Sequence, residues 1–369
     1  MKYAISLGEK GKCSAAPNPW VGCILVKKGK IVGKGYHSSP GTDHAEKKAL
    51  LDAGENARGS TAYITLEPCS HHGKTPPCAE ALIKAKIFKA FVAIKDPDPN
   101  VSGKGLEKLK QAGIPVELGV CRKNAISSLL PYLHQRITGK PYCILKAAIS
   151  IDGRIAASDG SSKWISNKQA RESVHRLRAE SQAIIIGSGT ALKDAPSLTV
   201  RLPTSKKNFK QPLRVLLDGN GSVPAEGALF DQSLAPTLIM TTKKAPDESL
   251  RSWRLAGAEI EVIPCGKNLL GVDLDAALDI LGKKGVLQAL IEGGSLLNGS
   301  FLKSGLIDRL RLYIGSCSIG EKGIPLFNGI GSNTMDELVH WRLTNMKSFS
   351  GNAQLDYKPK GENKCLQGL

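Results

Sequence analysis

The stretch Thr65–Cys78, TLEPCSHHGKTPPC, concentrates sulfur, imidazole and turn-forming residues in one short segment. Two cysteines and two histidines are interrupted by a lysine, a glycine and three prolines. The flanking segments have the patterns of an ordinary strand and an ordinary helix. Residues of these types at this density indicate a metal site, a disulfide loop, or a turn that contains neither.

The rest of the chain argues against the disulfide. Nine cysteines are an odd number for a disulfide framework, and the chain is long, with 369 residues. The N-terminal residues MKYAISLGEKGKC lack the long apolar core of a secretory signal peptide, and no apolar run is long enough to span a membrane. We therefore expect a cytoplasmic protein in which Cys69 and Cys78 stay reduced.

Composition and charge narrow the class of partner. With 41% apolar and 23% charged residues, the chain has the composition of a globular protein. Its net charge of +18 is spread along the sequence and suits a phosphorylated small substrate or a nucleic acid. Because only 5% of the residues are aromatic, few side chains can stack on bases. We expect a phosphorylated small-molecule partner, and neither nucleic acid nor membrane.

The pattern of strands and helices predicts two α/β domains. A hairpin is predicted over residues 21–36, followed by a helix over residues 43–54 with Asp43 as its N-cap and Gly54 as its terminator. Further alternation continues to about residue 120, and a second alternating run begins at residue 141. The hinge is expected in the polar stretch 134–142. The loop at 201–212 is expected to be exposed, and the tail at 361–369 to be frayed.

A second motif lies upstream of the opening stretch and gives it a chemical meaning. His44 and Glu46 open the helix predicted there, and Pro68–Cys69 ends a strand further along. A His-x-Glu followed by Pro-Cys and a further cysteine is typical of zinc-dependent nucleobase deaminases. One imidazole and two thiolates hold zinc and leave a fourth position for water. A carboxylate that is not a ligand, here Glu46, then transfers protons.

The cysteine spacing leaves other interpretations open. Eight residues separate Cys69 from Cys78, whereas the common deaminase signature has two. The segment between them can loop out and return, so one ion can still bind. A structural zinc site that uses His71 or His72 is a second possibility, and a loop without metal is a third.

The first half resembles the deaminase domain of the bifunctional riboflavin biosynthesis deaminase–reductases. The stretches that carry the resemblance are APNPWVGCILV (16–26), GKGYHSSPGTDHAEKKAL (33–50) and TAYITLEPCSHHGKTPPC (61–78). It implies one Zn²⁺ per chain on His44, Cys69 and Cys78, with Glu46 as the proton shuttle. Substrate contacts are implied for Asn18, His37, His71 and Lys74. Lys74 suits a phosphate or ribosyl oxygen.

Two glycine-rich turns mark the second half. IIIGSGTAL (184–192) and LIEGGSLLNGS (290–300) each have the pattern strand, turn, helix. Glycines at such turns let backbone N–H groups approach a phosphate. Neither turn is a GxGxxG dinucleotide fingerprint, and tight turns without a ligand are an equally good explanation for each one.

The resemblance continues through ILKAAISIDGRIAASDGSSKWIS (144–166), LRAESQAIIIGSGTALKDAPSLTVR (177–201) and ALIEGGSLLNGSFL (289–302). It implies a dihydrofolate-reductase-like fold that binds NADPH. Lys146 and Glu292 are then the ionisable groups near the ribose carbon, and Arg178 with Arg201 would clamp a phosphate. The chain has Ala195 where the family usually has a second acid after Asp194. Implied substrate contacts are Ser162, Arg178, Leu198, Arg201 and Glu292; implied cofactor contacts are Ala148, Trp164, Thr190, Asp194, Gly219, Gly294, Ser295, Leu296, Leu297, Asn298, Gly299 and Ser300.

The resemblance implies an α/β protein with an N-terminal cytidine-deaminase-like zinc domain at residues 1–144 and a reductase domain at residues 145–360. The first domain would hydrolytically deaminate 2,5-diamino-6-(5-phosphoribosylamino)pyrimidin-4-one. The second would reduce the ribosyl group to a ribityl chain. Two alternatives are an RNA or free-nucleoside deaminase with an unrelated appended nucleotide-binding domain, and a zinc module without catalysis. We also expect a homo-oligomer.

Overall fold

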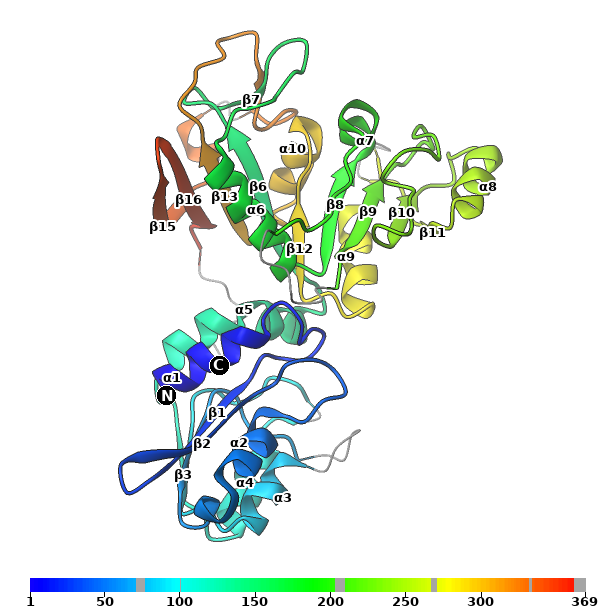
Figure 1. Ribbon diagram of the computed structural model, residues 1–369. Helices are drawn as coiled ribbons and strands as arrows, with labels where there is room; N and C mark the ends of the chain where they lie inside the picture. Colours follow the sequence, from blue (N-terminus) through cyan, green and yellow to red (C-terminus); the bar gives the residue numbers. More distant parts are fainter. Residues whose placement is uncertain (71–76, 100, 203–209, 267–270, 332–333, 362–369) are drawn as a thin grey trace. The chain divides into compact units, whose positions relative to one another are not determined.

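The computed structural model describes residues 1–70, 77–99, 101–202, 210–266, 271–331 and 334–361. The chain forms two compact units, the first spanning Met1–Lys140 and the second beginning at Pro141 (Figure 1). Within the described residues, no helix combines the length and apolar character that a bilayer crossing requires. Each unit has its own sheet and its own core.

A five-stranded mixed sheet forms the centre of the first unit, in the order β2-β1-β3-β4-β5. β1 pairs antiparallel with β2 and β3, while β3, β4 and β5 run parallel. The predicted hairpin is confirmed, and its turn lies at Lys28 and Gly29, both with positive φ. The strands are β1 (Gly22–Lys27), β2 (Lys30–Tyr36), β3 (Thr61–Ile64), β4 (Lys89–Val92) and β5 (Val116–Leu118).

Helices cover both faces of this sheet, and strand β1 is apolar on both sides. Cys23 and Leu25 of β1 belong to a core with α2, α3 and α4, whereas Ile24 between them packs against α1. Figure 1 shows α1 beside α5. The helices are α1 (Lys2–Gly8), α2 (Ala45–Ala53), α3 (Cys78–Lys84), α4 (Lys104–Gln111) and α5 (Arg122–Thr138), with 3₁₀ turns at Glu9–Gly11 and Gly54–Ala57.

Helix α2 lies directly on the backbone of β2. A Cβ atom on Gly33 would come within 2.2 Å of the Ala49 carbonyl oxygen, and one on Gly35 would come equally close to that of Ala45. The predicted N-cap of this helix is wrong. His44 occupies that position without a capping hydrogen bond, and Asp43 instead forms an ion pair with Lys47 at 2.6 Å. The predicted terminator Gly54 is confirmed as the C-cap.

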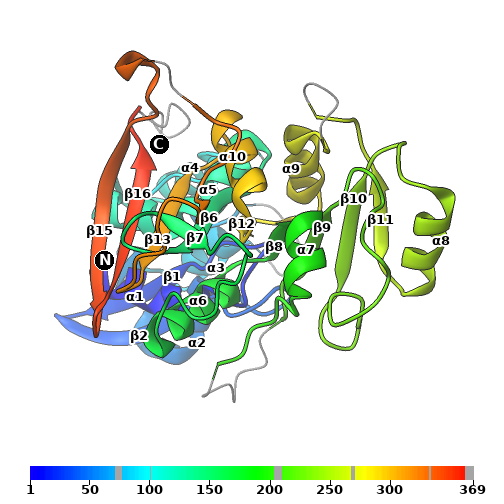
Figure 2. The same ribbon diagram turned by 90° about the horizontal axis from the view of Figure 1, so that it is seen from above.

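The second unit contains a nine-stranded sheet in the order β11-β10-β9-β8-β12-β6-β13-β16-β15 (Figure 2). The strands from β11 to β13 are parallel, and β16 and β15 add an antiparallel edge. The strands are β6 (Tyr142–Ile149), β8 (Ala183–Gly187), β9 (Leu213–Leu217), β10 (Thr237–Thr241), β11 (Glu259–Val262), β12 (Gln288–Ile291), β13 (Arg309–Ile314), β15 (Trp341–Phe349) and β16 (Asn352–Pro359), with β7 (Arg154–Ala156) and β14 (Ile324–Pro325) as a separate pair.

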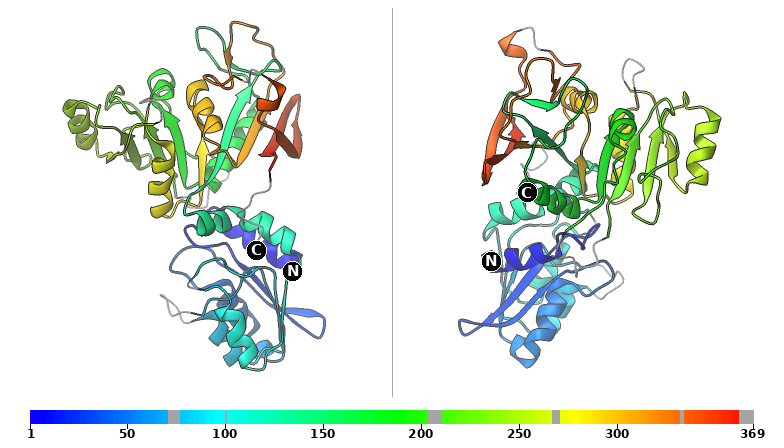
Figure 3. Two further views of the ribbon diagram at one scale, coloured as in Figure 1. Left: turned by 180° about the vertical axis from the view of Figure 1, so that it is seen from behind. Right: turned by 45° about the horizontal axis from the view of Figure 1, so that its top comes forward.

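Strands β8, β12 and β6 run side by side in the middle of this sheet (Figure 3). Strands buried on both faces read as continuous apolar runs, as β10 and β12 do here. Because β8 and β12 are parallel, the turns that follow them lie at the same end of the sheet. This is the carboxyl end of the strands, where α/β proteins bind ligands. The helices are α6 (Lys168–Glu180), α7 (Ser188–Asp194), α8 (Asp247–Leu255), α9 (Leu274–Lys283) and α10 (Ser295–Lys303), with a 3₁₀ turn at Met335–Glu337.

Candidate active sites

The metal ligands expected in the first unit come together from three elements. His44 stands at the N-terminus of α2, Cys69 follows β3, and Cys78 is the first residue of α3. His44 Nδ1 lies 3.6 Å from Cys69 Sγ and 3.3 Å from Cys78 Sγ. The three donor atoms all lie within 4.8 Å of one another.

These separations fit a tetrahedral zinc ion. With Zn–S bonds of about 2.3 Å and Zn–N bonds of about 2.0–2.1 Å, an imidazole nitrogen and a thiolate on one ion are roughly 3.5 Å apart. The observed nitrogen–sulfur distances bracket that value. Three protein ligands leave one tetrahedral position for water or substrate, as in catalytic zinc sites.

The electrostatics of the two sulfurs also suit a cation. The Cys78 thiol donates a hydrogen bond to Cys69, and with the help of His44 this lowers the pKa of Cys69 to about 4. The backbone N–H of Cys78 also points at Cys69 Sγ, at 3.4 Å. The pKa of Cys78 is raised because its thiol keeps its proton in that hydrogen bond and is buried, and charge repulsion from Glu46 and Cys69 adds to the rise. A bound cation would remove that repulsion and ionise both thiols.

Glu46 lies in the first turn of α2 and is only 3% exposed. Burial, followed by the charge of Cys69, raises the pKa of its carboxyl to about 7. Its carboxyl also hydrogen-bonds to Cys78, which places it beside the cluster of donor atoms. The structure thus brings Glu46 to the three expected ligands without making it one of them.

Asn18 contacts His37, and His37 in turn contacts His44. The rings of His37 and His44 meet edge to face, with centroids 5.2 Å apart. His37 Nδ1 lies 3.4 Å from the Asp43 carbonyl oxygen, which can only accept, so this nitrogen carries the proton. His37 Nε2 then accepts a hydrogen bond from Asn18 Nδ2 at 3.1 Å, and this bond does not use the side-chain oxygen Oδ1 of Asn18. His71 and Lys74 lie outside the described residues.

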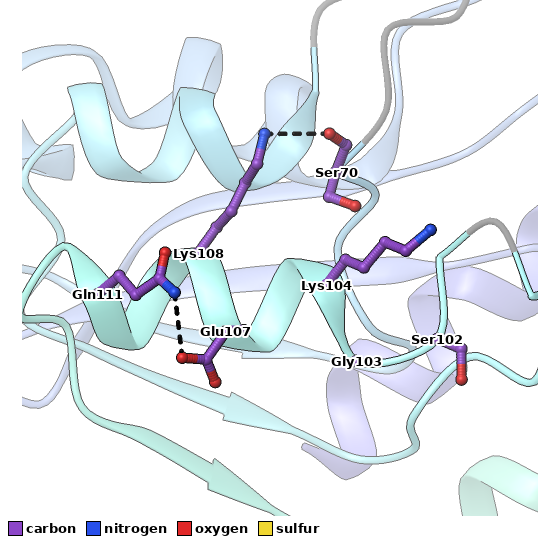
Figure 4. Close-up of a pocket in the computed structure, with 7 residues that line it drawn as sticks. All are labelled: Ser70, Ser102, Gly103, Lys104, Glu107, Lys108 and Gln111. Atoms are coloured by element: carbon purple, nitrogen blue, oxygen red, sulfur yellow. Dashed lines mark hydrogen bonds between the residues drawn. The ribbon is translucent and has the colours of Figure 1, made fainter.

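A hollow of about 490 Å³ lies next to the segment that carries Cys69 (Figure 4). Its lining residues come from α4, from the two residues before that helix and from Ser70, which follows Cys69. Lys108 reaches across it and donates to the Ser70 carbonyl oxygen at 3.1 Å. Among the expected site residues that the structure describes, none lines this hollow, whose described lining residues are Ser70, Ser102, Gly103, Lys104, Glu107, Lys108 and Gln111.

In the second unit, Glu292 connects two of the expected basic residues. It follows β12, and its side chain is 8% exposed. Arg178 of α6 binds it through two parallel bonds, Nε to Oε1 at 2.6 Å and Nη2 to Oε2 at 3.0 Å. Lys146 of β6 lies 3.5 Å from Glu292 Oε2. Burial alone would raise the pKa of Glu292, but Arg178 and Lys146 outweigh it and lower the pKa to about 2.

This geometry changes the interpretation of Arg178. Its fork holds Glu292, and its Nη1 donates to the Thr199 carbonyl oxygen at 3.1 Å. The expected phosphate clamp of Arg178 with Arg201 is therefore not the arrangement that the structure shows. The long-range pairing with Glu292, across 114 residues of sequence, takes that fork instead. Arg201 is exposed.

The Glu292 ion pairs predict an acid-sensitive second unit. A carboxyl whose pKa falls from 4.5 to about 2 on folding contributes stability above pH 4.5, and that stability is lost as the pH falls from about 4.5 to about 2. The difference corresponds to about 3 kcal/mol in the free energy of unfolding. Urea unfolding of the wild type and of Glu292→Gln at pH 7 and pH 3 would measure it. We expect the variant to be less stable at pH 7 and to lose less on acidification; equal losses would contradict the assignment.

Two residues that the sequence did not single out, His175 of α6 and Gln211, contact the segment that follows α7. His175 Nδ1 accepts from the Arg201 N–H at 3.2 Å, and Gln211 binds both backbone groups of Val200. Burial, with Arg178 and Arg201 nearby, lowers the pKa of His175 to about 4, so its ring is neutral at pH 7. The sequence pattern of α6 did not single out His175, because the Arg201 N–H that it binds lies in another segment.

Ala195 has a definite place in the same segment. It is the C-cap of α7 with a positive φ of 39°, directly after Asp194, which is exposed. Leu198 also has a positive φ, of 51°, and its side chain is buried. This departure from the family pattern therefore falls at the turn that ends α7.

The two glycine-rich turns, which follow β8 and β12, are in contact at the carboxyl end of these strands. A Cβ atom on Gly294 would lie 3.3 Å from Thr190 Oγ1, so the starts of α7 and α10 are in contact. Ser295 and Asn298 bond to the carbonyl oxygens of Pro325 and Leu326 respectively. Among the other expected cofactor contacts, Leu296 and Ser300 are exposed, whereas Gly299 packs against Asn328. Leu297 is half-buried.

The remaining expected contacts are spread over neighbouring elements. Ala148 is on β6, and Ser162 lies two residues before Trp164. Trp164 is 69% exposed, and the guanidinium carbon of Arg171 lies 4.1 Å from the centroid of its ring. Gly219 follows β9 and is buried, with its carbonyl oxygen bonded to Thr242.

The fold and the two sites define a zinc-dependent deaminase domain followed by a reductase domain. The family profile of the cytidine and deoxycytidylate deaminase zinc-binding region matches residues 1–94, and that of the RibD C-terminal domain matches residues 141–355. The chain belongs to the RibD family of riboflavin biosynthesis proteins. It is 45% identical over 332 residues to the riboflavin biosynthesis protein RibD of Chlamydia pneumoniae, covering 90% of this chain and 88% of the relative.

Other relatives agree. RibD of Escherichia coli K12 is 40% identical over 330 residues, covering 87% of this chain and 88% of the relative. The structure of Acinetobacter baumannii RibD matches with a TM-score of 0.88 at 37% identity and 98% coverage of each chain. A deaminase/reductase from Thermotoga maritima matches with a TM-score of 0.85 at 31% identity, covering 97% of each.

These matches confirm the family and the fold class expected from the sequence. The chain is a bifunctional enzyme of riboflavin biosynthesis, with a cytidine-deaminase-like domain and a dihydrofolate-reductase-like domain. The alternative of a nucleic-acid or nucleoside deaminase with an unrelated appended domain is wrong, because the second half matches the RibD C-terminal domain.

Proposed function

We propose that residues 1–144 and 145–360 divide the two reactions between them. In the first, the diaminopyrimidine ribosyl phosphate loses its exocyclic 2-amino group as ammonia. In the second, its ribosyl group is reduced to a ribityl chain with NADPH. The observation that carries the first assignment is the buried Glu46 beside three donors spaced as zinc ligands. The buried carboxylate between Arg178 and Lys146 supports the second.

In the deaminase site, His44, Cys69 and Cys78 would hold the zinc ion. When bound there, zinc supplies the Lewis acidity that makes water nucleophilic at neutral pH. Glu46 takes the proton of the attacking water and delivers it to the departing ammonia. Asn18, held by His37, presents its carbonyl oxygen to the pyrimidine. His71 and Lys74 stay predicted substrate contacts.

Removal of zinc should separate the two activities. After treatment with a chelator, we expect ammonia release from the diamino substrate to fall to background, because His44, Cys69 and Cys78 alone cannot activate water. NADPH oxidation with the deaminated intermediate should persist, since no proposed reductase residue is a zinc ligand. Coupled ammonia and NADPH assays on one sample would measure both. Added zinc should restore ammonia release; an unchanged deaminase rate after full zinc removal would contradict the assignment.

In the reductase site, NADPH supplies hydride to the ribose carbon, and the ring oxygen that is released needs a proton. We propose that Lys146 donates it. Glu292 holds the Lys146 ammonium toward the substrate, and Arg178 fixes Glu292 by its two parallel bonds. The adjacent turns at Thr190 and Gly294 would receive the phosphates of NADPH.

The other expected substrate and cofactor contacts are proposed to surround Lys146 and Glu292. Arg201 is proposed to bind the substrate phosphate in place of an arginine pair, because Arg178 is engaged by Glu292. Ser162 and Leu198 would complete the substrate site. Cofactor contacts are proposed for Ala148, Trp164, Asp194, Gly219, Ser295, Leu296, Leu297, Asn298, Gly299 and Ser300.

We also propose a cytoplasmic homo-oligomer that acts on a small phosphorylated substrate and binds neither nucleic acid nor membrane. No disulfide joins the cysteines that the structure describes, which suits a reducing compartment. The net charge of +18 suits an anionic substrate. Size-exclusion chromatography with light scattering would give the number of chains.

A further inference from the structure

We propose that Glu67 is a positioning residue of the zinc centre, acting through the N-terminus of α4. The inference rests on the proposed zinc site at His44, Cys69 and Cys78. Glu67 stands two residues before Cys69 and is only 4% exposed. Its carboxylate binds the backbone at the start of a helix that begins 37 residues later in the chain.

The carboxylate of Glu67 caps α4 from a distance. Its Oε2 accepts the N–H groups of Asp96 at 3.2 Å and Gly103 at 2.9 Å. Its Oε1 accepts those of Gly105 at 2.9 Å and Leu106 at 3.4 Å. The local N-cap of α4 is Gly103, which has no side chain to offer. Glu67 therefore satisfies N–H groups that the first turn of a helix leaves unpaired, at the end where a negative charge is favourable.

A close backbone contact reinforces this anchor. A Cβ atom on Gly105 would lie 1.9 Å from the Pro68 carbonyl oxygen, so only glycine allows α4 to approach the segment between Glu67 and Cys69 this closely. The backbone on either side of Cys69 is held as well. The Glu67 N–H donates to the Ile94 carbonyl oxygen at 2.9 Å, and Lys108 of α4 holds the Ser70 carbonyl oxygen.

The same helix also contacts α3, which begins at Cys78. Lys108 Nζ lies 2.8 Å from Glu80 Oε1, and Glu80 lies two residues after Cys78 on α3. That ion pair is exposed and contributes little by itself. The buried capping bonds of Glu67 are the stronger half of the arrangement. Helix α4 thus contacts both cysteine-bearing segments, in addition to their direct contacts through the Cys78 and Ala79 N–H groups.

The consequence is that Glu67 controls how tightly zinc is held without touching it. Residues behind metal ligands typically change metal affinity by about 10–100-fold when they are replaced. In Glu67→Gln, an isosteric amide has one acceptor oxygen, and its NH₂ group faces N–H donors. In Gly105→Ala, the added methyl group pushes the Pro68 carbonyl away. Alanine usually stabilises a helix relative to glycine, so a loss of zinc affinity in Gly105→Ala would identify this contact.

The experiment measures zinc transfer from the zinc-loaded full chain to a chromogenic chelator, together with the thermal midpoint of the first unit. We expect zinc release about 10-fold faster or more in Glu67→Gln and in Gly105→Ala than in the wild type. Excess zinc should restore part of the ammonia release. The matched control is Leu7→Ala, which removes a buried side chain of α1 from the separate core that α1 forms with Ile24, where no residue of α2, α3 or α4 takes part.

The outcomes separate a positioning role from a general loss of stability. Release that is accelerated in both Glu67→Gln and Gly105→Ala, but unchanged in Leu7→Ala, supports the inference. Wild-type release rates in those two variants, or equal acceleration in Leu7→Ala, would overturn it while leaving the zinc site intact. A wild-type chain that retains no zinc would instead overturn the proposed function, and this inference with it.

Discussion

Glu46→Gln is expected to keep its zinc and to lose ammonia release, with kcat falling by about 10²–10⁴-fold. The amide has nearly the shape of the carboxylate it replaces, so the buried position beside the zinc ligands stays filled. It cannot carry a proton between the attacking water and the leaving amine. Metal content by atomic emission and a coupled ammonia assay on the same preparation would test both halves of this expectation.

The second activity serves as an internal control for this variant. NADPH oxidation with the deaminated intermediate should match the wild type, since Glu46 and the reductase residues belong to different units. Glu55→Gln, at an exposed position just beyond α2, is the matched control and should retain full deaminase activity. If Glu46→Gln turned over at the wild-type rate with its zinc in place, Glu46 would not be the proton shuttle.

Lys146→Met is expected to have the second largest effect. Methionine preserves much of the length of the side chain and its apolar stem but removes the ammonium group that lies 3.5 Å from Glu292. Without a proton donor for the ribose oxygen, we expect kcat for NADPH oxidation to fall by about 10²–10⁴-fold. Stopped-flow absorbance of NADPH with the deaminated intermediate would measure the reductive step directly.

The effect should be confined to one reaction. Ammonia release from Lys146→Met should equal that of the wild type. Lys283→Met, at an exposed position on α9, should leave both rates unchanged. Since Arg178 still binds Glu292 in two parallel bonds, we expect the second unit to stay folded. NADPH oxidation at the wild-type rate would assign the proton to another donor.

The metal centre was predictable because its residue types follow a recognisable pattern, although His44 lies 25 and 34 residues from the two cysteines. His44 and Glu46 are two positions apart at a helix start, and Cys69 and Cys78 bracket one loop. The chemistry of zinc restricts which residue types can serve, and the resemblance to the deaminase domains chose among the interpretations that the wide cysteine spacing left open. The capping role of Glu67 was not predictable, because its four partners are backbone N–H groups, which every residue except proline offers and no sequence pattern marks.

Long-range pairing also limited what the sequence could show in the second unit. Arg178 has a helical pattern and a charge that suit a phosphate, and nothing local indicates that Glu292 takes its fork. The stretch 134–142, expected to contain the hinge, does contain the boundary between the two units at Lys140 and Pro141, although α5 continues to Thr138 within it. The hairpin of β15 and β16 was missed since β15 is exposed along most of its length and shows no apolar alternation.

The bare backbone of β2 at Gly33 and Gly35 limits how far this enzyme can vary. Both glycines lie against carbonyl oxygens of α2, the helix that carries Glu46 and begins at His44. Any substitution there would lift the helix from the sheet and carry the imidazole away from the two sulfurs. A redesign of the pyrimidine specificity would therefore have to inherit this pair of glycines unchanged.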